Sequence, residues 1–257
     1  MSDEPRLHEA TMIRTLQSNE ELLSARDSLR KRGLDFSQEG SKRLWDLLYS
    51  LRYRTAAPPW EMFKSWDVAN VLEIAERQLP QRSAPVLDLG CYNSAILWVL
   101  YRSKFSRLYG CDLNPMCKWM PYWNHIYYQA ADLTHTSYAD HSYALISCLS
   151  VIEHGVPLDA LVTEVTRLLK PGGIFVFTTD YDATGESHVV APELRPFNLD
   201  WKIFSRLGLW EIIGKFERAG LSLLEPNNVA DKHEARPITW EGQSYTFVMV
   251  ALRAPSP

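Results

Sequence analysis

Four acidic residues recur at nearly equal intervals through the middle of this 257-residue chain. Asp88, Asp112, Asp132 and Glu153 are separated by 24, 20 and 21 residues, about the length of one strand followed by one helix. Each lies within or shortly after a short apolar run of the kind that forms a buried strand. These apolar runs are residues 86–90, 108–112, 126–130 and 143–148. Taken alone, any one of the four acidic residues would suit a helix N-cap or an exposed loop.

Buried strands that alternate with helices form a parallel sheet covered on both faces. In such open sheets, ligands bind outside the carboxyl ends of the strands. We therefore expect the four acidic side chains to gather at one edge of the sheet, where a ligand would bind.

Two helices and three strands are predicted after Glu153. In chain order they are a helix at 158–169, a strand at 174–178, a helix at about 210–219 and strands at 221–224 and 245–250. The first helix stops at the sequence Lys170-Pro171-Gly172-Gly173. The last two strands have only a loop between them, which predicts antiparallel pairing.

The N-terminal part, residues 1–57, is predicted to be helical, and a further helix follows it. The predicted helices are residues 19–29, 41–51 and about 60–78. Gly33 is the expected stop of the first helix, and Pro58-Pro59 interrupts the helical pattern before the third.

Composition excludes several classes of protein. The net charge of −4 and the pI near 6.0 argue against a general nucleic-acid or membrane-surface binder. The charged N-terminus lacks the apolar region of a signal peptide, so the expected compartment is the cytoplasm with the four cysteines reduced. The spacing of Cys111 and Cys117 is not a common zinc spacing, and the histidines are scattered, so no metal site is predicted.

The turn after the first strand contains one glycine, Gly90, whose flexible backbone allows a ligand to approach closely. A dinucleotide fingerprint would place glycine also at the positions of Tyr92 and Ala95. Alanine is tolerable at the last position, but tyrosine at the middle one is not. No tyrosine has lysine four positions later, so a nicotinamide-dependent reductase is disfavoured.

Five segments, taken together, resemble a known family. They are VLDLGCYNS, LYGCDLNP, AADLT, ISCLSVIEH and LLKPGGIFVF, and they extend over about residues 85–180. In order and spacing they resemble class I S-adenosylmethionine-dependent methyltransferases of the small-molecule, type 11-like kind. The resemblance implies a Rossmann-like α/β fold with a mostly parallel seven-stranded sheet, helices on both faces, an antiparallel last strand and a helical N-terminal extension.

On this basis we divide the chain into two parts. Residues 1–80 form the helical extension that caps the core, and residues 81–257 form the S-adenosylmethionine-binding core. Within the core, residues 181–205 are long for a loop of a compact domain, and we expect them to form an insertion on the side of the methyl acceptor.

The resemblance also assigns cofactor roles to particular residues. It implies that Gly90 and the backbone of Leu149 lie at the methionine part, and that Asp88 supports the first loop. Tyr92 stands where the family usually has glycine, so either the loop is displaced or the ring packs over the cofactor. The remaining positions are Asp112 at the ribose hydroxyls, Leu113 beside the adenine, and Asp132 and Leu133 at the adenine amino group.

His154 is the candidate catalytic residue, because the resemblance places it facing the transferable methyl group. It would act as a general base, since the ordinary pKa of histidine, about 6.5, suits proton removal near neutrality. The alternative is a histidine that only ties neighbouring loops together. Asp180 and Tyr181 follow the fifth strand and are candidate acceptor contacts, as are the aromatic residues Tyr53 and Trp60, whose alternative role is packing.

The predicted function is therefore methyl transfer from S-adenosylmethionine to an oxygen or nitrogen of a small molecule, such as a sugar or a natural-product intermediate. The alternative is a non-catalytic binding or partner subunit that keeps the fold. Expected partners are the small-molecule acceptor and, as an open alternative, a second copy in a homodimer. Neither nucleic acid nor a membrane is expected.

Overall fold

The computed structural model describes residues 13–34, 64–79, 81–120, 124–195, 199–224 and 235–256, and the structural statements below concern these residues. The predicted helix at 41–51 and the residues Tyr53 and Trp60 lie outside them. None of the described helices is long and apolar enough to cross a bilayer.

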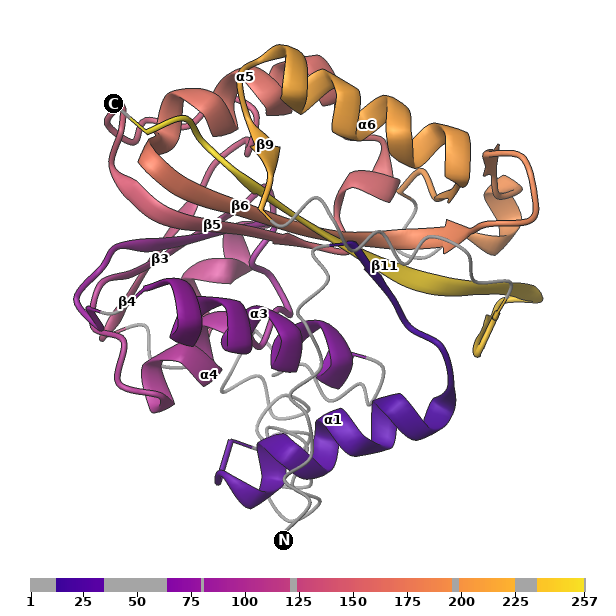
Figure 1. Cartoon of the computed structure of the whole chain (residues 1–257), viewed down its shortest axis with the longest axis horizontal. Helices are drawn as coiled ribbons and strands as arrows, with labels where there is room; N and C mark the ends of the chain where they lie inside the picture. Colours follow the sequence, from indigo (N-terminus) through magenta and orange to yellow (C-terminus); the bar gives the residue numbers. More distant parts are fainter. Residues whose placement is uncertain are drawn as a thin grey trace, which may run out of the picture.

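A mixed sheet runs through the middle of the molecule (Figure 1). In spatial order its strands are β1 (Ile13–Thr15), β11 (Gln243–Arg253), β6 (Leu169–Asp182), β5 (Tyr143–Leu149), β2 (Val86–Leu89), β3 (Leu108–Asp112) and β4 (Ile126–Ala130). The five strands from β6 to β4 are parallel to their neighbours, whereas β11 is antiparallel to β6. The predicted parallel sheet with an antiparallel last strand is confirmed.

Four short strands pair with this sheet. They are β7 (His188–Val189), β8 (Lys202–Ser205), β9 (Ser222–Leu223) and β10 (Ile238–Trp240). β8 pairs in parallel with the last two residues of β6, and β7 pairs antiparallel with β8. β9 and β10 both pair antiparallel with β11, so the predicted antiparallel pairing of the two tail strands is confirmed.

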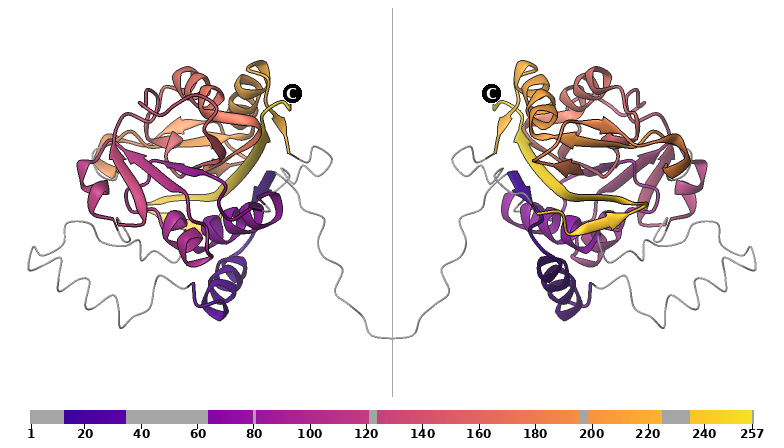
Figure 2. Two further views of the ribbon diagram at one scale, coloured as in Figure 1. Left: turned by 90° about the vertical axis from the view of Figure 1, so that its left-hand side faces the viewer. Right: turned by 90° about the vertical axis from the view of Figure 1, so that its right-hand side faces the viewer.

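Helices cover both faces of the sheet, as Figures 1 and 2 show. α5 (Leu158–Leu168) and α6 (Arg206–Arg218) lie on one face. α3 (Lys64–Gln78) and α4 (Ile96–Arg102) lie on the other, with α1 (Asn19–Lys31) packed outside α3. Their buried positions follow helical spacing, as Leu161, Val165 and Leu168 show for α5.

Each face of the sheet has its own hydrophobic core. Along β6, Ile174 and Val176 belong to the core on the α3 side, and Phe175 and Phe177 to the core on the α5 side. This alternation follows from the strand period of two residues. The four residues of β2 are all buried, as expected for a central parallel strand. Consecutive residues at a strand end therefore point to opposite faces, which decides which of them share a site.

The N-terminal prediction holds only in part. α1 confirms the first helix, and Gly33 follows it with φ +68°. The expectation of helix from residue 1 onward is wrong at Ile13–Thr15, which form β1. Ile13 and Thr15 are buried and pair with Val250 and Val248 of β11, so the edge of the sheet imposes the strand.

Candidate functional site

The turn after β2 folds tightly against two other strand ends. Gly90 has φ +78°, and a Cβ built there would lie 2.4 Å from Cγ2 of Val151, in the loop after β5. The backbone N–H groups of Gly90 and Cys91 donate to the carbonyl oxygen of Cys111 in β3, at 2.9 and 3.1 Å. Only glycine fits this position, and the turn brings the ends of β2, β3 and β5 together.

Asp112, at the end of β3, is held by backbone N–H groups on both carboxylate oxygens. Oδ2 accepts from the N–H of Tyr92 at 2.9 Å, and Oδ1 accepts from the N–H of Asn114 at 2.8 Å. Burial raises the pKa of Asp112, and these two hydrogen bonds oppose the rise. Each oxygen keeps a further lone pair, so the half-buried carboxylate has the right chemistry to accept from two vicinal hydroxyls.

Tyr92 keeps the first loop close to Asp112 through its backbone, although it replaces the glycine usual at that position. Its side chain is half-buried and packs against the core on the α3 side. The substitution is therefore accommodated by packing of the ring, while the backbone N–H still reaches the end of β3.

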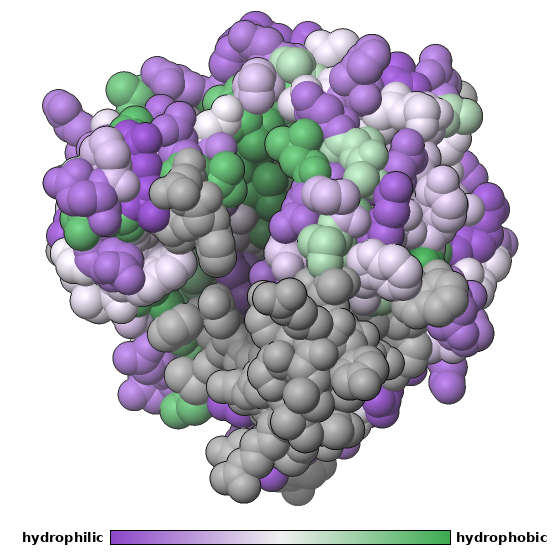
Figure 3. All heavy atoms as spheres, turned by 180° about the vertical axis from the view of Figure 1, so that it is seen from behind, coloured by the Kyte–Doolittle hydropathy of each residue, from purple (hydrophilic) through white to green (hydrophobic). Residues whose placement is uncertain are grey.

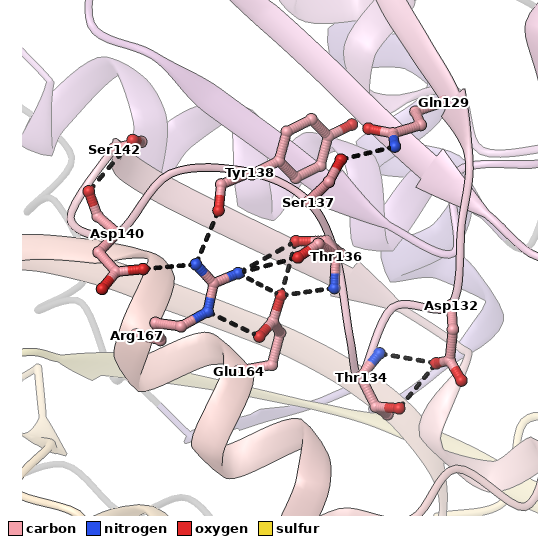
Figure 4. A network of polar contacts seen from close by, with 10 residues as sticks. All are labelled: Gln129, Asp132, Thr134, Thr136, Ser137, Tyr138, Asp140, Ser142, Glu164 and Arg167. Carbon is pink, nitrogen blue, oxygen red and sulfur yellow. Dashed lines mark hydrogen bonds and ion pairs between the residues drawn. The ribbon is translucent and has the colours of Figure 1, made fainter.

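The loop after β4 carries a second carboxylate toward the same edge. Oδ1 of Asp132 accepts from the backbone N–H and the hydroxyl of Thr134, at 2.8 and 2.7 Å, which lowers the pKa of Asp132 (Figure 4). Oδ2 accepts no hydrogen bond from the residues that the structure describes. Leu133 is buried and anchors this loop in the core, whereas Leu113 is 69% exposed, which is unusual for leucine.

A side-chain network that the sequence analysis did not find fixes the continuation of this loop (Figure 4). Glu164 of α5 accepts from the N–H and the hydroxyl of Thr136, at 2.8 and 2.6 Å. Arg167 donates to both oxygens of Glu164, at 2.9 and 2.7 Å, to the carbonyl of Tyr138 at 2.7 Å and to Asp140 at 2.6 Å. The Glu164-x-x-Arg167 spacing on one helix was its only trace in the sequence.

Asp88 lies in β2 beneath the first loop, fully buried. Its Oδ1 accepts from the hydroxyl of Ser147 in β5, at 2.6 Å. Burial raises the pKa of Asp88 to about 7, although the Ser147 hydroxyl acts against the rise. The contact ties β2 to β5 at the point where both strands reach the site.

His154 lies in the short turn η2 (Ile152–His154), which follows β5 and Leu149. Its Nδ1 lies 2.9 Å from the carbonyl oxygen of Asp200, which can only accept, so Nδ1 carries the proton. Burial lowers the pKa of His154. At neutral pH the ring is therefore uncharged, with its lone pair on Nε2, which has no hydrogen-bond partner among the described residues.

Three buried carboxylates share the influence of Lys64, and we call them the acid cluster: Asp67 from α3, Glu153 from η2 and Asp180 from β6, of which Asp180 also feels His154. Burial raises the pKa of Glu153 to about 7 and that of Asp180 to about 8, and each feels the charge of Lys64. Asp180 is the only one of these carboxylates that the sequence pointed to as an acceptor contact. Asp67 was missed, because an acidic residue in a predicted helix gives no sign of burial.

Tyr181 does not join this group. It is fully buried in the core on the α5 side, whereas Asp180, one residue earlier in β6, faces the opposite side. Its side chain offers no exposed surface to an acceptor. The structure thus brings Asp180 and His154 together and leaves Tyr181 in the core.

Two carboxylates at this edge, Asp112 and Asp132, have spare acceptor capacity, and the apolar side chain of Leu113, next to Asp112 in the sequence, is exposed. Figure 3 shows the molecule from behind, with a hollow near the middle of this face that is lined in part by hydrophobic residues. Among the described residues, no group of histidine, cysteine and acidic side chains could hold a metal ion.

Comparison with solved structures shows the same fold. The chain is similar to the [4+2]-cyclase SpnF (16% identity, 84% of this chain and 96% of that one, TM-score 0.54). It is also similar to an S-adenosylmethionine-dependent methyltransferase from Methanosarcina mazei (14% identity, 72% of this chain and 98% of that one, TM-score 0.52). A third similar structure is the geranyl diphosphate C-methyltransferase from Streptomyces coelicolor (17% identity, 75% of this chain and 80% of that one, TM-score 0.50).

Sequence comparison identifies the family directly. No curated protein matches the sequence. A family model described as a methyltransferase domain matches residues 61–225, which is more than half of the chain and contains the ends of β2 to β6. The chain therefore belongs to this methyltransferase family and is an S-adenosylmethionine-dependent methyltransferase.

Proposed function

We propose that this enzyme methylates an oxygen or nitrogen atom of a small molecule, with His154 as the general base. The observation that supports this most is the hydrogen bond from Nδ1 of His154 to the carbonyl of Asp200. It fixes the ring in the form that has a basic Nε2, one short turn beyond β5. A base with a pKa at or below 6.5 is unprotonated and ready at neutral pH.

The cofactor would be held by the residues at the ends of β2 to β5. Asp112 would accept from the ribose hydroxyls, and the free Oδ2 of Asp132 from the adenine amino group. Leu113 would cover a face of the adenine. Gly90 and the backbone of Leu149 would lie at the methionine part, with Asp88 supporting the first loop from below.

When bound, S-adenosylmethionine supplies a methyl group on a positively charged sulfur, and this carbon–sulfur bond breaks as the acceptor atom bonds to carbon, with the electron pair left on sulfur. The residues of the chain have to place the acceptor atom in line and exclude water. Nε2 of His154 takes the proton that the acceptor oxygen or nitrogen loses. The Asp200 carbonyl then stabilises the resulting imidazolium through Nδ1–H.

The test is a transfer assay with methyl-labelled S-adenosylmethionine and a panel of small hydroxyl and amino compounds, with binding of S-adenosylhomocysteine measured in parallel. We expect S-adenosylhomocysteine to raise the melting temperature of the protein, since a ligand at 100 times its Kd adds about 2.7 kcal/mol to stability. If neither S-adenosylmethionine nor S-adenosylhomocysteine binds at millimolar concentration, the proposal is overturned. Binding without transfer to any acceptor would instead favour a role other than methyl transfer, as in the structurally similar [4+2]-cyclase.

A further inference from the structure

The residue that follows β5 has a strained backbone. Ser150 comes directly after Leu149 and has φ +52°, in the left-handed region that residues other than glycine rarely adopt. Such a conformation persists only where the surrounding structure holds it, and it occurs most often at functional sites. Here the turn brings the next residue, Val151, against Gly90 of the first loop. The contacts that hold Ser150 therefore bear on the shape of this part of the site.

Four residues, from α3, the turn after β5 and β6, form a closed ring of contacts. The ammonium group of Lys64 donates to the hydroxyl of Ser150. The N–H of Ser150 donates to the carbonyl oxygen and to the hydroxyl of Thr178, each at 3.1 Å. The hydroxyl of Thr178 donates to Oδ2 of Asp67 at 3.3 Å, and this oxygen lies 3.5 Å from Nζ of Lys64. Ser150 is thus held at its hydroxyl by α3 and at its N–H by β6.

Lys64 is the member of this ring that reaches it from the surface. It begins α3 and lies 86 residues before Ser150 in the sequence. Its side chain is 25% exposed, and its ammonium group lies 4.7 Å from the centroid of the Phe247 ring. Asp67 and Thr178, in contrast, are fully buried. Lys64 is therefore the part of the ring that a substitution can remove with the least disturbance of the core.

We propose that Lys64 is a positioning residue for the methionine part of S-adenosylmethionine: through the hydroxyl of Ser150 it keeps the turn after β5 in place beside Gly90. The inference rests on the proposed function, which places the methionine part at Gly90 and the backbone of Leu149. A hydrogen bond from a charged donor is about twice as strong as a neutral one, so this contact is suited to hold an unfavourable backbone conformation. Lys64 acts on the cofactor only through this turn.

The test compares two ligands that differ in the amino-acid part. S-adenosylhomocysteine carries this part, whereas 5′-methylthioadenosine keeps the adenosine and the sulfur but lacks it. Calorimetry gives the Kd of each ligand for the wild type and for Lys64→Met. We expect Lys64→Met to raise the Kd of S-adenosylhomocysteine roughly 10-fold, the worth of one charge-assisted hydrogen bond, and to leave that of 5′-methylthioadenosine nearly unchanged. A lysine that only stabilised the fold would not change the ratio of the two Kd values.

Ser150→Ala tests the same contact from its other end. It removes the hydroxyl and leaves Lys64 in place, so it should raise the Kd of S-adenosylhomocysteine by a similar factor. The double variant of Lys64→Met and Ser150→Ala should lose no more affinity than either single variant, because both changes break one contact. If the two losses add instead, Lys64 does not act through Ser150, and the inference is overturned.

Arg77→Met is the matched control, since it removes a cation from the same helix, where the side chain is exposed and paired with Glu73. It should change neither Kd. If Lys64→Met or Ser150→Ala folds and keeps the wild-type ratio of the two Kd values, the inference is overturned and the proposed function stands. If Lys64→Met does not fold, the ratio in Ser150→Ala decides by itself. If the wild type does not bind S-adenosylhomocysteine, the proposed function fails, and this inference fails with it.

Discussion

Two carboxylates of the proposed cofactor side differ from those of the proposed acceptor side in the hydrogen-bond donors they receive. Asp112 and Asp132 receive backbone N–H donors from their own loops, and Glu164 behind them is bound by Arg167. The acid cluster has one lysine among three carboxylates and two buried oxygens without donors in the described part of the chain. On the first side, Oδ2 of Asp88 beneath the first loop is likewise buried without a donor among the described residues, so the contrast concerns Asp112 and Asp132.

This difference bears on what each side binds. A carboxylate whose geometry is fixed by donors is preorganised, so it can accept from a ligand with little rearrangement. A buried carboxylate without donors is held at a cost.

The largest effect is expected at the boundary between the two sides. His154→Ala should lower turnover by about 10²- to 10⁴-fold and leave cofactor affinity nearly unchanged, because it removes a general base and no cofactor contact. The wild-type rate should fall only at a pH below the ordinary histidine pKa of about 6.5, because burial lowers the pKa of His154, and the variant should lack that fall. The measurement is turnover against pH together with calorimetry of S-adenosylhomocysteine. Near wild-type turnover with the same pH profile would leave His154 a residue that only ties loops together.

A smaller effect, confined to the cofactor side, is expected for Asp112→Ala. The loss of a charged acceptor for two hydroxyls should cost roughly 1.5–3 kcal/mol of binding, about 10- to 150-fold in the Kd of S-adenosylhomocysteine. Calorimetry measures this directly. Asp159→Ala, which removes an exposed carboxylate on α5, is the control and should bind as the wild type does. Unchanged affinity in folded Asp112→Ala would show that the first loop, and not this carboxylate, holds the ribose.

Arg167→Met tests whether the network of Figure 4 preorganises the cofactor side. It leaves the buried carboxylate of Glu164 without its cation, so stability should fall by about 2 kcal/mol. Cofactor affinity should fall a few fold, because the loop from Asp132 to Asp140 loosens. Lys215→Met breaks only the exposed ion pair to Asp159 and should cost a few tenths of a kcal/mol without touching affinity. Denaturant titration and calorimetry separate the two effects; equal affinities in both variants would refute the positioning role.

The smallest expected effect is a difference between Glu153 and Asp132 in how each contributes to stability as the pH changes. The pKa of Glu153 is raised to about 7, so its contribution to stability is fully present below its ordinary value of about 4.5 and is lost as pH rises through 7. Glu153→Gln should therefore be more stable than the wild type by on the order of 1–2 kcal/mol at pH 8, with little gain at pH 4.5. Lys64, Asp67 and Asp180 face the same group, and removing this charge also lowers the pKa of Asp180.

At Asp132 the sign of this pH dependence reverses. The N–H of Thr134 lowers the pKa of Asp132, so the contribution of Asp132 is present above its ordinary pKa and is lost as pH falls through the lowered one. Asp132→Asn should thus weaken the protein at neutral pH and hardly change it under strong acid. Denaturant titrations of both variants across pH measure the contrast, and two curves that move in the same direction would abolish it.

The sequence by itself determined the parallel sheet and the strand ends at which its acidic residues lie. The apolar runs at 86–90 and 108–112 can be buried only as central strands, and the carboxylates that end such strands must gather at one edge. Period and spacing are properties of the chain, and for that reason Asp112 and Asp132 could be identified before any contact was known. The family resemblance, and not this spacing, made His154 a candidate, and the hydrogen bond that fixes its tautomer is made to the carbonyl of Asp200, a residue 46 positions away.

Only the tertiary structure decided the edge of the sheet and the acid cluster. Ile13–Thr15 are too few for a local pattern, and β11 makes them a strand. Asp180 and Tyr181 are neighbours in the sequence, yet the pleat sends one to the acid cluster and the other into the opposite core. Asp67 reads as an ordinary helix residue, and its burial depends on where α3 packs against β5 and β6. Burial and unmet hydrogen bonds arise from what surrounds a side chain, and that is set by segments distant in the sequence.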